Sequence, residues 1–329
     1  MLAVCNPFSL ETIGEIPLGT WDQADSWLNT ADKLHSDRSS WLPAYERITI
    51  LHKAAVLMRD RFEELAFQIA NEGGKPLIDA RIEVDRAIDG LELAAKELSH
   101  LTGSEIPMDL TAAGAGRMAF TSKETIGPVV AVSAFNHPLN LIVHQVAPAV
   151  ATGCPVIIKP ADGTPLSAQS FVNILYEAGL PPEWCLYFSC NIPTAEQLVT
   201  DPRVAFFGFI GSARVGWMLR SKLAPGTRAA LEHGSAAPVI IDETADIKSM
   251  IPLLVKGGFY HAGQVCVSVQ RVFVPNAMAK DIAALIGEQA DKLIVGNAIN
   301  EDTEVGPLIR PGEVVRVAEW VVDVLEHER

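Results

Sequence analysis

The spacing of apolar residues predicts helices in the first third of the chain. Between residues 44 and 70 apolar side chains recur at steps of three and four, which predicts one amphipathic helix over that range. These positions are Ile48, Leu51, Ala55, Met58, Phe62, Leu65 and Ile69. A second helix is predicted over 77–101. Between the two, Gly73 and Gly74 are typical of a helix C-cap and Pro76 of a stop.

Short apolar runs bounded by Gly, Pro or polar turns predict buried strands in the rest of the chain. The runs are 128–135, 155–160, 204–211, 238–242 and 271–275, and helical segments at 139–152 and 166–178 separate the first three. Strands that alternate with helices predict an α/β fold with right-handed crossovers and a doubly wound parallel sheet. Ligands bind such sheets at the carboxyl ends of the strands. The candidate binding loops are therefore FNHP (135–138), KPADGTP (159–165) and GSARVG (211–216).

Two other segments stand out by composition. Residues near 104–126 are rich in Gly, Ala and Thr, which predicts an extended arm or hairpin. Residues 125–158 contain no charged side chain and are long enough to span a membrane. Four prolines interrupt that stretch, and buried parallel strands are also charge-free, so a core element is the preferred interpretation.

Charge and cysteine content narrow the class of protein. A net charge of -14 repels phosphate backbones and anionic lipid, so nucleic acid and membrane surfaces are not expected as partners. The five cysteines are scattered, without the spacing of a zinc site, so no metal site is predicted. The N-terminus lacks the pattern of a secretory signal. A reducing, cytoplasmic setting is therefore expected.

Two strand ends contain residues suited to nucleotide binding. Gly211 would allow a sharp turn, and Ser212 at a helix N-terminus could meet a phosphate, although a turn of this composition is often only a turn. Lys159 follows an uncharged run and must emerge at the surface; with Asp162 it could bind ribose hydroxyls or form an ordinary solvated strand end. A strict Rossmann reading would instead take Glu232, which lies 21 residues beyond Gly211, as the ribose ligand.

Three residues are candidates for catalysis. Asn136 could donate to an oxyanion, although Asn in such a position is usually a turn residue. Glu232 is flanked by apolar residues, and such surroundings suit a general base, although a solvated strand end is the default interpretation for such a glutamate. Cys266 lies between Val265 and Val267, so it is either a nucleophile or a small packed hydrophobe.

The order of these segments resembles the signature blocks of the aldehyde dehydrogenase superfamily. The matching blocks are FNHPLNLIVHQVAPAVATGCPVIIKPADGTPLSA, FIGSARVG, LEHGSAAPVI and GGFYHAGQVCVSVQRVFV. Similar family segments, including EGGKP and VGPLIRPGEVVRVAEWV, extend the resemblance over nearly the whole chain. The resemblance implies a Rossmann-type NAD-binding domain at 1–231 and the N-terminal part of a catalytic domain at 232–329.

The resemblance also implies roles for individual residues. Cys266 matches the thiol that attacks the aldehyde, Asn136 the oxyanion donor and Glu232 the base that hydrolyses the thioester, so the ribose role of Glu232 falls away. The implied cofactor contacts are Lys159, Asp162, Ser212 and Gly211, with Phe135 where the cofactor cleft begins. The implied reaction is oxidation of an aldehyde to a carboxylic acid. Because the Asp162 carboxylate should repel a 2′-phosphate, NAD is expected rather than NADP.

The sequence departs from the family pattern at several positions. Ile210 replaces a usual Thr, His233 and Ser235 stand in a usual Glu-Leu-Gly-Gly block, and His137 occupies a position that is often aromatic. His137 suggests a polar or anionic aldehyde, and Val265 gives that suggestion no support. After AEWVVDVLEHER the resemblance would continue into the strand used for subunit pairing, so an incomplete catalytic domain with exposed apolar surface is expected.

Two functions remain open at this point. The family implies a homo-oligomeric enzyme that acts on a small-molecule aldehyde with NAD. The alternative is a shortened, non-catalytic nucleotide-binding remnant, or a subunit that needs a partner to supply the missing part.

Overall fold

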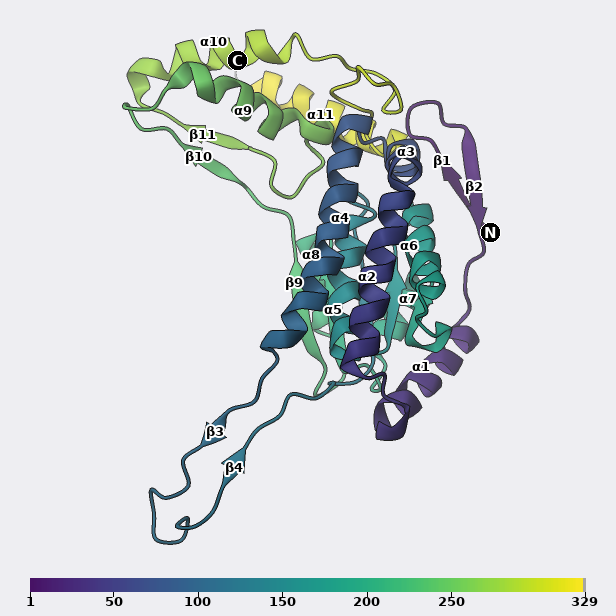
Figure 1. The fold of residues 1–329 in the computed structure, drawn as a ribbon. Coiled ribbons are helices and arrows are strands. Elements are labelled where there is room, and N and C mark those ends of the chain that lie inside the picture. Colours follow the sequence, from purple (N-terminus) through teal and green to yellow (C-terminus); the bar gives the residue numbers. More distant parts are fainter. Residues whose placement is uncertain (328–329) are drawn as a thin grey trace.

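A five-stranded parallel sheet forms the centre of the computed structural model, which describes residues 1–327 (Figure 1). Its strands are β5 (Val129–Val132), β6 (Val156–Lys159), β7 (Cys185–Tyr187), β8 (Phe206–Ile210) and β9 (Arg228–Glu232). They lie in the order β7-β6-β5-β8-β9, and all neighbours are parallel. The order reverses between β5 and β8, and a doubly wound sheet opens a binding crevice at that point.

Helices cover both faces of this sheet. One face carries α2 (Ala44–Asp60), α3 (Phe62–Gly73), α4 (Leu77–Glu97), α5 (Asn140–Thr152) and α6 (Pro165–Glu177). The other carries α1 (Trp21–Ser36), α7 (Ile192–Thr200) and α8 (Ala213–Arg220). The doubly wound α/β architecture predicted from the alternating runs is confirmed.

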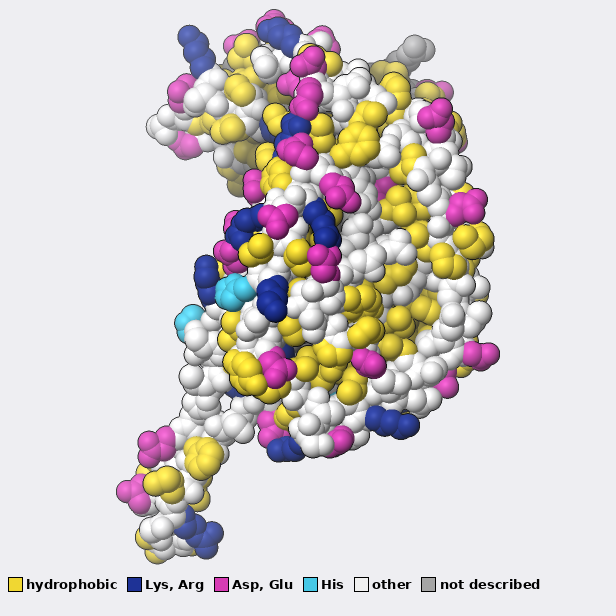
Figure 2. Space-filling model, turned by 45° about the vertical axis from the view of Figure 1, so that its right-hand side comes forward, with side chains coloured by type: hydrophobic (Ala, Val, Ile, Leu, Met, Phe, Trp, Pro, Cys, Tyr) yellow, Lys and Arg dark blue, Asp and Glu magenta, His cyan; other side chains and the backbone are white. Residues whose placement is uncertain are grey.

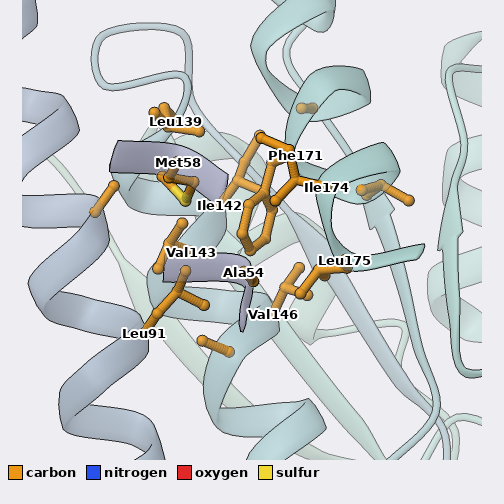
Figure 3. Close-up of a cluster of buried hydrophobic side chains, with 14 of the residues drawn as sticks. Ala54, Met58, Leu91, Leu139, Ile142, Val143, Val146, Phe171, Ile174 and Leu175 are labelled. Atoms are coloured by element: carbon orange, nitrogen blue, oxygen red, sulfur yellow. The ribbon is translucent and has the colours of Figure 1, made fainter. Parts of the chain in front are cut away.

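The central strands supply side chains to both hydrophobic cores. In β5, Val129 and Ala131 pack in the larger core under α2 to α6, whereas Val130 packs in the smaller core under α1, α7 and α8. This alternation follows from the two-residue period of a strand. Figure 3 shows part of the larger core, where Phe171 and Leu175 of α6 lie near Met58 of α2 and apolar residues of α5. A strand that is apolar on both faces explains the charge-free stretch.

The predicted helix over 44–70 is in fact two helices. The backbone leaves helical geometry at Arg61, with φ of -110° and ψ of 22°, and α2 and α3 lie on either side of it. The apolar period continues across the break because both helices pack on the same core, with Met58 and Leu65 both buried. Gly74 caps α3 in the left-handed conformation, with φ of 68°, as its sequence suggested.

Two strands of the sheet were not predicted. Strand β7 has only three residues, and it follows a short 3-10 helix at Pro182–Trp184. Strand β9 lies at the edge and is mostly exposed, and its apolar run is only Ala-Ala-Leu, without a β-branched or aromatic residue. They were missed because β7 is very short and β9 contributes little to the core.

Two antiparallel hairpins extend from this body. Strands β1 (Leu2–Cys5) and β2 (Thr12–Ile16) pair near the N-terminus, and β3 (Glu105–Ile106) pairs with β4 (Ala119–Phe120). The β3–β4 arm projects away from the sheet (Figure 1), and Figure 2 shows hydrophobic side chains at its surface. Leu110, Met118 and Phe120 are exposed on it.

The residues after β9 form a separate small core. Strands β10 (Pro238–Ile240) and β11 (Arg271–Phe273) pair in parallel, and α9 (Ile247–Phe259) and α10 (Ala279–Ala290) pack on them. The chain then returns to the first body, where Leu77 donates a backbone hydrogen bond to Ala298 at 2.9 Å. The last helix is α11 (Pro311–His327), which has no buried residue.

Apolar side chains are exposed on this second part, as expected from the sequence. They include Ile240, Leu253 and seven residues of α11, among them Trp320 and Leu325. Short 3-10 helices at Arg38–Ser40, Leu98–His100 and Asn276–Met278 and a left-handed turn at Tyr260–Gly263 complete the described elements. Within residues 1–327 no helix has both the length and the apolar character required to cross a bilayer.

Candidate active site

Cys266 follows a turn with unusual backbone geometry. His261, Ala262 and Gly263 have φ values of 49°, 55° and 72°, so three consecutive residues are left-handed. His261 and Ala262 carry a Cβ atom, and this conformation is costly for such residues unless the surroundings fix it. The fully buried His261 side chain and the packed Val265 anchor the turn. Cys266 itself is half-buried, so its thiol is neither sealed in the core nor fully solvated.

Gln264 links this turn to two other segments. Its side-chain nitrogen donates to the backbone oxygens of His261 at 3.1 Å and Pro307 at 3.3 Å, and its side-chain oxygen accepts from Ile309 at 2.9 Å. Its backbone oxygen accepts from the Nδ2 atom of Asn136 at 2.9 Å. Gln264 therefore holds the cysteine turn against the loop after β5 and the loop before α11.

The Asn136 amide is buried and aimed at the cysteine turn. Only 8% of Asn136 is exposed. One hydrogen of its Nδ2 group is used on Gln264, which leaves the second hydrogen for another acceptor. The backbone N–H of Cys266 donates no hydrogen bond to another group within residues 1–327. Two donors are thus available for an oxyanion beside the thiol.

Glu232 is the last residue of β9, where its backbone oxygen accepts from Gly211 at 3.0 Å. Its side chain is exposed. This exposure agrees with the default interpretation of a solvated strand end; most residues of β9, an edge strand, are exposed, so the apolar neighbours in the sequence do not bury the carboxylate.

Two cavities meet at Cys266. The first has a volume of about 710 Å³ and extends beneath α4 and α5, where Arg86, His137 and His144 contribute polar groups. The second, of about 480 Å³, opens at the carboxyl ends of β5 and β8, which is the switch point of the sheet. Both are lined by the same five residues: Phe209, Ile210, Glu232, Val265 and Cys266.

Several predicted cofactor contacts line the 480 Å³ cavity. Phe135, Gly211 and Ser212 lie on its wall, together with Ala161 of the loop after β6. Ser212 caps α8, and its Oγ atom accepts from the backbone of Val215 at 3.4 Å. The cavity thus includes a strand end, a capped helix N-terminus and the loop that carries the other two predicted contacts.

Those two contacts, Lys159 and Asp162, pair with each other. The Nζ atom of Lys159 lies 2.6 Å from Oδ1 of Asp162 and 2.9 Å from the oxygen of Pro160. Only 11% of the Lys159 side chain is exposed, whereas 57% of the Asp162 side chain is exposed. The ammonium thus does not fully emerge, and the carboxylate beside it compensates for its partial burial.

The backbone bends at Gly211, between β8 and α8, as predicted. Its φ is not in the left-handed region, but a Cβ atom there would lie 2.7 Å from the ring of Phe209. Glycine is needed at this position for close packing rather than for an unusual dihedral.

Comparison with known proteins agrees with this arrangement. Residues 1–328 match the model of the "Aldehyde dehydrogenase family". The chain belongs to the aldehyde dehydrogenase family.

Relatives match over nearly the full chain. It is 36% identical over 327 residues to 3-sulfolactaldehyde dehydrogenase of Priestia aryabhattai, covering 99% of this chain and 68% of that protein. Among solved structures, glyceraldehyde-3-phosphate dehydrogenase GapN of Methanocaldococcus jannaschii in complex with NADP matches with a TM-score of 0.90 and 34% identity, covering 99% and 70% of the two chains. Aldehyde dehydrogenase 21 of Physcomitrella patens, solved with the reaction product succinate, matches with a TM-score of 0.93 and 34% identity, covering 99% and 68%.

In this member of the aldehyde dehydrogenase family the EGGKP segment makes contacts that sequence analysis did not predict. Lys75 is fully buried and pairs with the buried Glu83 of α4. Glu83 Oε1 accepts from the backbones of Leu139 at 2.9 Å and Asn140 at 3.1 Å, at the start of α5. This pair fixes the segment that follows Asn136. A lysine after two glycines was the only sequence signal, and it did not indicate a partner.

Glu72 holds the neighbouring helix in the same way. Its carboxylate is fully buried and accepts from the backbones of Leu166 and Ser167, both at 2.8 Å, at the start of α6. Burial raises the pKa of Glu72 to about 7, although the hydrogen bonds from Ser167 and Leu166 oppose the shift. The two charged residues of EGGKP therefore anchor the starts of α5 and α6.

The departures from the family pattern have structural consequences. The ring of His233 packs against Phe209 at 6.1 Å and Trp217 at 5.6 Å between centroids. The Oγ atom of Ser235 accepts from the backbone of Ala237 at 3.1 Å. Ile210 lies on the wall shared by the two cavities. His233 is thus packed among aromatic rings.

Proposed function

We propose that this aldehyde dehydrogenase oxidises an aldehyde to a carboxylic acid with NAD through a covalent intermediate on Cys266. One observation carries the proposal: Cys266 and Glu232 line both the 710 Å³ cavity and the 480 Å³ cavity. A thiol at the junction of two cavities can react with a substrate in one of them while a cofactor occupies the other.

The residues of the 480 Å³ cavity fit a dinucleotide. Phe135, Gly211 and Ser212 lie at the switch point, where nucleotides bind doubly wound sheets, and the N–H groups at the start of α8 suit a phosphate. Lys159 and Asp162 extend this set toward a ribose. The chemistry that a nicotinamide dinucleotide supplies when bound is acceptance of a hydride, which turns a thiohemiacetal into a thioester.

In the first step the Cys266 thiolate attacks the aldehyde carbon. The new carbon–sulfur bond displaces the π electrons of the carbonyl onto its oxygen, which becomes negative. The Asn136 amide and the Cys266 backbone N–H are the donors for that oxyanion, and preorganised donors of this kind stabilise it by several kcal/mol. Asn136 is suited to the task because Gln264 fixes its amide.

In the last step Glu232 removes a proton from water. The hydroxide attacks the thioester carbon, the carbon–sulfur bond breaks, and the carboxylic acid leaves while the Cys266 thiolate is regenerated. The exposure of Glu232 supports this role, since the base must exchange its proton with solvent. The presence of this carboxylate favours hydrolysis over transfer of the acyl group to another thiol.

We propose NAD as the preferred cofactor. The Asp162 carboxylate is 57% exposed next to the predicted ribose site, where it would accept from the 2′-hydroxyl and repel a 2′-phosphate. The NADP complex of the Methanocaldococcus GapN relative makes this preference a point to test.

The substrate is proposed to be a polar or anionic aldehyde. Arg86, His137 and His144 line the 710 Å³ cavity. Within residues 1–327 Arg86 has no carboxylate within ion-pairing distance, so it is available to an anionic substrate. The names of the relatives agree, since one acts on 3-sulfolactaldehyde and another was solved with succinate.

We also propose the domain division suggested by the sequence, with an NAD-binding domain at 1–231 and part of a catalytic domain at 232–329. The separate core of β10, β11, α9 and α10 supports a boundary near Leu231. Five free thiols agree with a reducing, cytoplasmic setting. Assembly into a homo-oligomer remains a proposal.

A second candidate is a nucleotide-binding subunit that is inactive without a partner. The exposed apolar residues of α11 and β10 favour it, because monomeric proteins rarely expose such surface. Under this proposal the chain binds NAD but oxidises no aldehyde alone.

The production of NADH tests the proposal. The purified chain is incubated with NAD and polar, anionic and aliphatic aldehydes, and absorbance of NADH is followed. We expect turnover that Cys266→Ser abolishes and Cys5→Ser, which alters another accessible thiol, does not. NAD binding without NADH would favour the subunit proposal, and absence of both would refute the two proposals together.

A further inference from the structure

Lys75 holds its ammonium group entirely inside the protein. It is one of the largest fully buried side chains, and a buried charge is costly unless partners satisfy it. Its Nζ atom contacts Glu83, lies 5.8 Å from the centre of the Tyr260 ring and lies 2.8 Å from the Nδ1 atom of His137. His137 lies on the cavity wall, and its contact with Lys75 determines which of its ring nitrogens carries the proton.

The Glu83 carboxylate is ionised. Burial alone would raise the pKa of Glu83, but the Lys75 ammonium outweighs burial and lowers it. Burial lowers the pKa of Lys75, and the Glu83 carboxylate opposes that shift. Because an ammonium has three donors and no acceptor, Lys75 donates to His137 as well as to Glu83.

The hydrogen-bond direction determines the tautomer of His137. Nδ1 lies 2.8 Å from Nζ of Lys75 but 3.5 Å from the nearest oxygen of Glu83, so Nδ1 accepts from Lys75 rather than donating to Glu83. A neutral imidazole has one N–H, which must then be on Nε2.

The charged and titratable groups around His137 keep it in that neutral form. Burial lowers the pKa of His137, and Lys75 and Arg86 lower it further, while Glu83 acts in the opposite direction. The other titratable neighbours are Tyr260, His144 and His261. Burial lowers the pKa of both of these histidines as well.

The Nε2–H group faces space rather than protein. His137 lines the 710 Å³ cavity together with Cys266, and Nε2 has no hydrogen-bond partner among residues 1–327. Polar atoms that are sealed inside without a partner include both ring nitrogens of His261 but not Nε2 of His137. A fixed donor thus opens onto the cavity that contains the thiol.

We propose that His137 is a specificity-determining residue, whose Nε2–H, oriented by Lys75, donates a hydrogen bond to an oxygen substituent on the carbon chain of the aldehyde. The inference rests on the proposed function and deepens it, because it selects hydroxyaldehydes over aliphatic aldehydes of equal length. An aliphatic substrate displaces water from the cavity without accepting a hydrogen bond from Nε2–H. Its binding is therefore less favourable than that of a hydroxyaldehyde.

The first test compares 2-hydroxypropanal with propanal. We expect the wild-type chain to favour the hydroxyaldehyde in kcat/KM, and His137→Phe to reduce the ratio of the two efficiencies by roughly tenfold, the value of one hydrogen bond. His137→Gln, which retains a donor, should restore part of the ratio. His52→Phe, an exposed change on α2, is the matched control.

The outcomes separate this inference from the proposed function. If the wild-type chain oxidises no aldehyde of the panel that tests the proposed function, that function fails and this inference with it; if it oxidises others but neither of these two, only this inference is wrong. If it oxidises both but His137→Phe keeps the wild-type ratio, only this inference is wrong.

A second measurement does not depend on activity. Two-dimensional ¹⁵N NMR of the histidine rings, with the His137 signals assigned by their loss in His137→Phe, reports the tautomer directly. We expect an unprotonated Nδ1 and a protonated Nε2 that do not change between about pH 7 and pH 8. A protonated Nδ1 would overturn the proposed orientation by Lys75.

Discussion

The Nδ2 atom of Asn136 donates to the backbone oxygen of Gln264 at 2.9 Å, and this bond connects the loop after β5 to the turn that carries Cys266. The two residues are 128 positions apart in the chain and belong to the two separately packed parts of the protein. The bond therefore sets the position of the proposed oxyanion donor relative to the proposed nucleophile.

Removal of the Asn136 amide should impair the chemical step. We expect Asn136→Ala to lower kcat about 100-fold, because one preorganised oxyanion donor is lost. Steady-state kinetics with a saturating aldehyde measures the effect. Asn191→Ala, which removes the cap of α7 far along the chain, is the matched control and should keep kcat within twofold or so. Equal kcat values for the two variants would exclude Asn136 from the reaction.

Cofactor preference should depend on Asp162. Replacement by serine removes the carboxylate and leaves Lys159 unpaired, so a 2′-phosphate becomes favourable. We expect Asp162→Ser to shift the ratio of kcat/KM for NAD to that for NADP toward NADP by about tenfold or more. Glu183→Gln, a change of charge in the turn before β7, serves as control. A wild-type chain that already prefers NADP would contradict the proposed role of Asp162.

Glu72 should make the protein less stable as the pH rises. Its pKa is raised to about 7 in the folded chain from an ordinary value of 4.5. Between these values the folded state binds more protons than the unfolded state, so the contribution of Glu72 is fully present below pH 4.5 and is lost as the pH passes 7. The contribution amounts to about 3 kcal/mol in the free energy of unfolding.

Urea unfolding at about pH 5 and pH 8 measures this contribution. Glu72→Gln cannot titrate, so we expect it to lose less stability than the wild type on going to the higher pH. Glu64→Gln, an exposed change on α3, should behave like the wild type. The comparison between variants removes the opposite effect of His137 and His261, which stay neutral when folded. An identical pH dependence in Glu72→Gln would show that Glu72 is not the titrating group.

The sheet was predictable from sequence wherever burial dominates. The strands β5, β6 and β8 are apolar on both faces because helices cover both faces of the sheet. Such continuous apolar runs can be recognised as buried strands in the sequence. Strand β9 was missed because an edge strand contributes little to the core. The break at Arg61 was missed because the spacing of apolar residues continues unchanged from one helix to the next when both helices pack on the same core.

Only those site residues that lie in recognisable sequence motifs could be predicted. Cys266, Asn136 and Glu232 were identified through the resemblance, and the structure brings Cys266 and Glu232 to the wall of the same cavities. The apolar residues that flank Glu232 in the sequence could not decide between a desolvated base and a solvated strand end, because flanking residues in sequence are not the neighbours in space. The roles of Lys75, Glu83 and Gln264 were not predicted, because their partners lie far away in the chain or on another element.

The central claim is that Cys266 forms a covalent bond with the substrate carbon and that Glu232 hydrolyses the product. The measurement that tests it most directly is intact-protein and peptide mass spectrometry of Glu232→Gln after incubation with NAD and an aldehyde. We expect one acyl group per chain, located on the peptide containing Cys266, together with one equivalent of NADH and no further turnover. An unmodified Cys266 after NADH has formed, or an acyl group on another cysteine, would contradict the account.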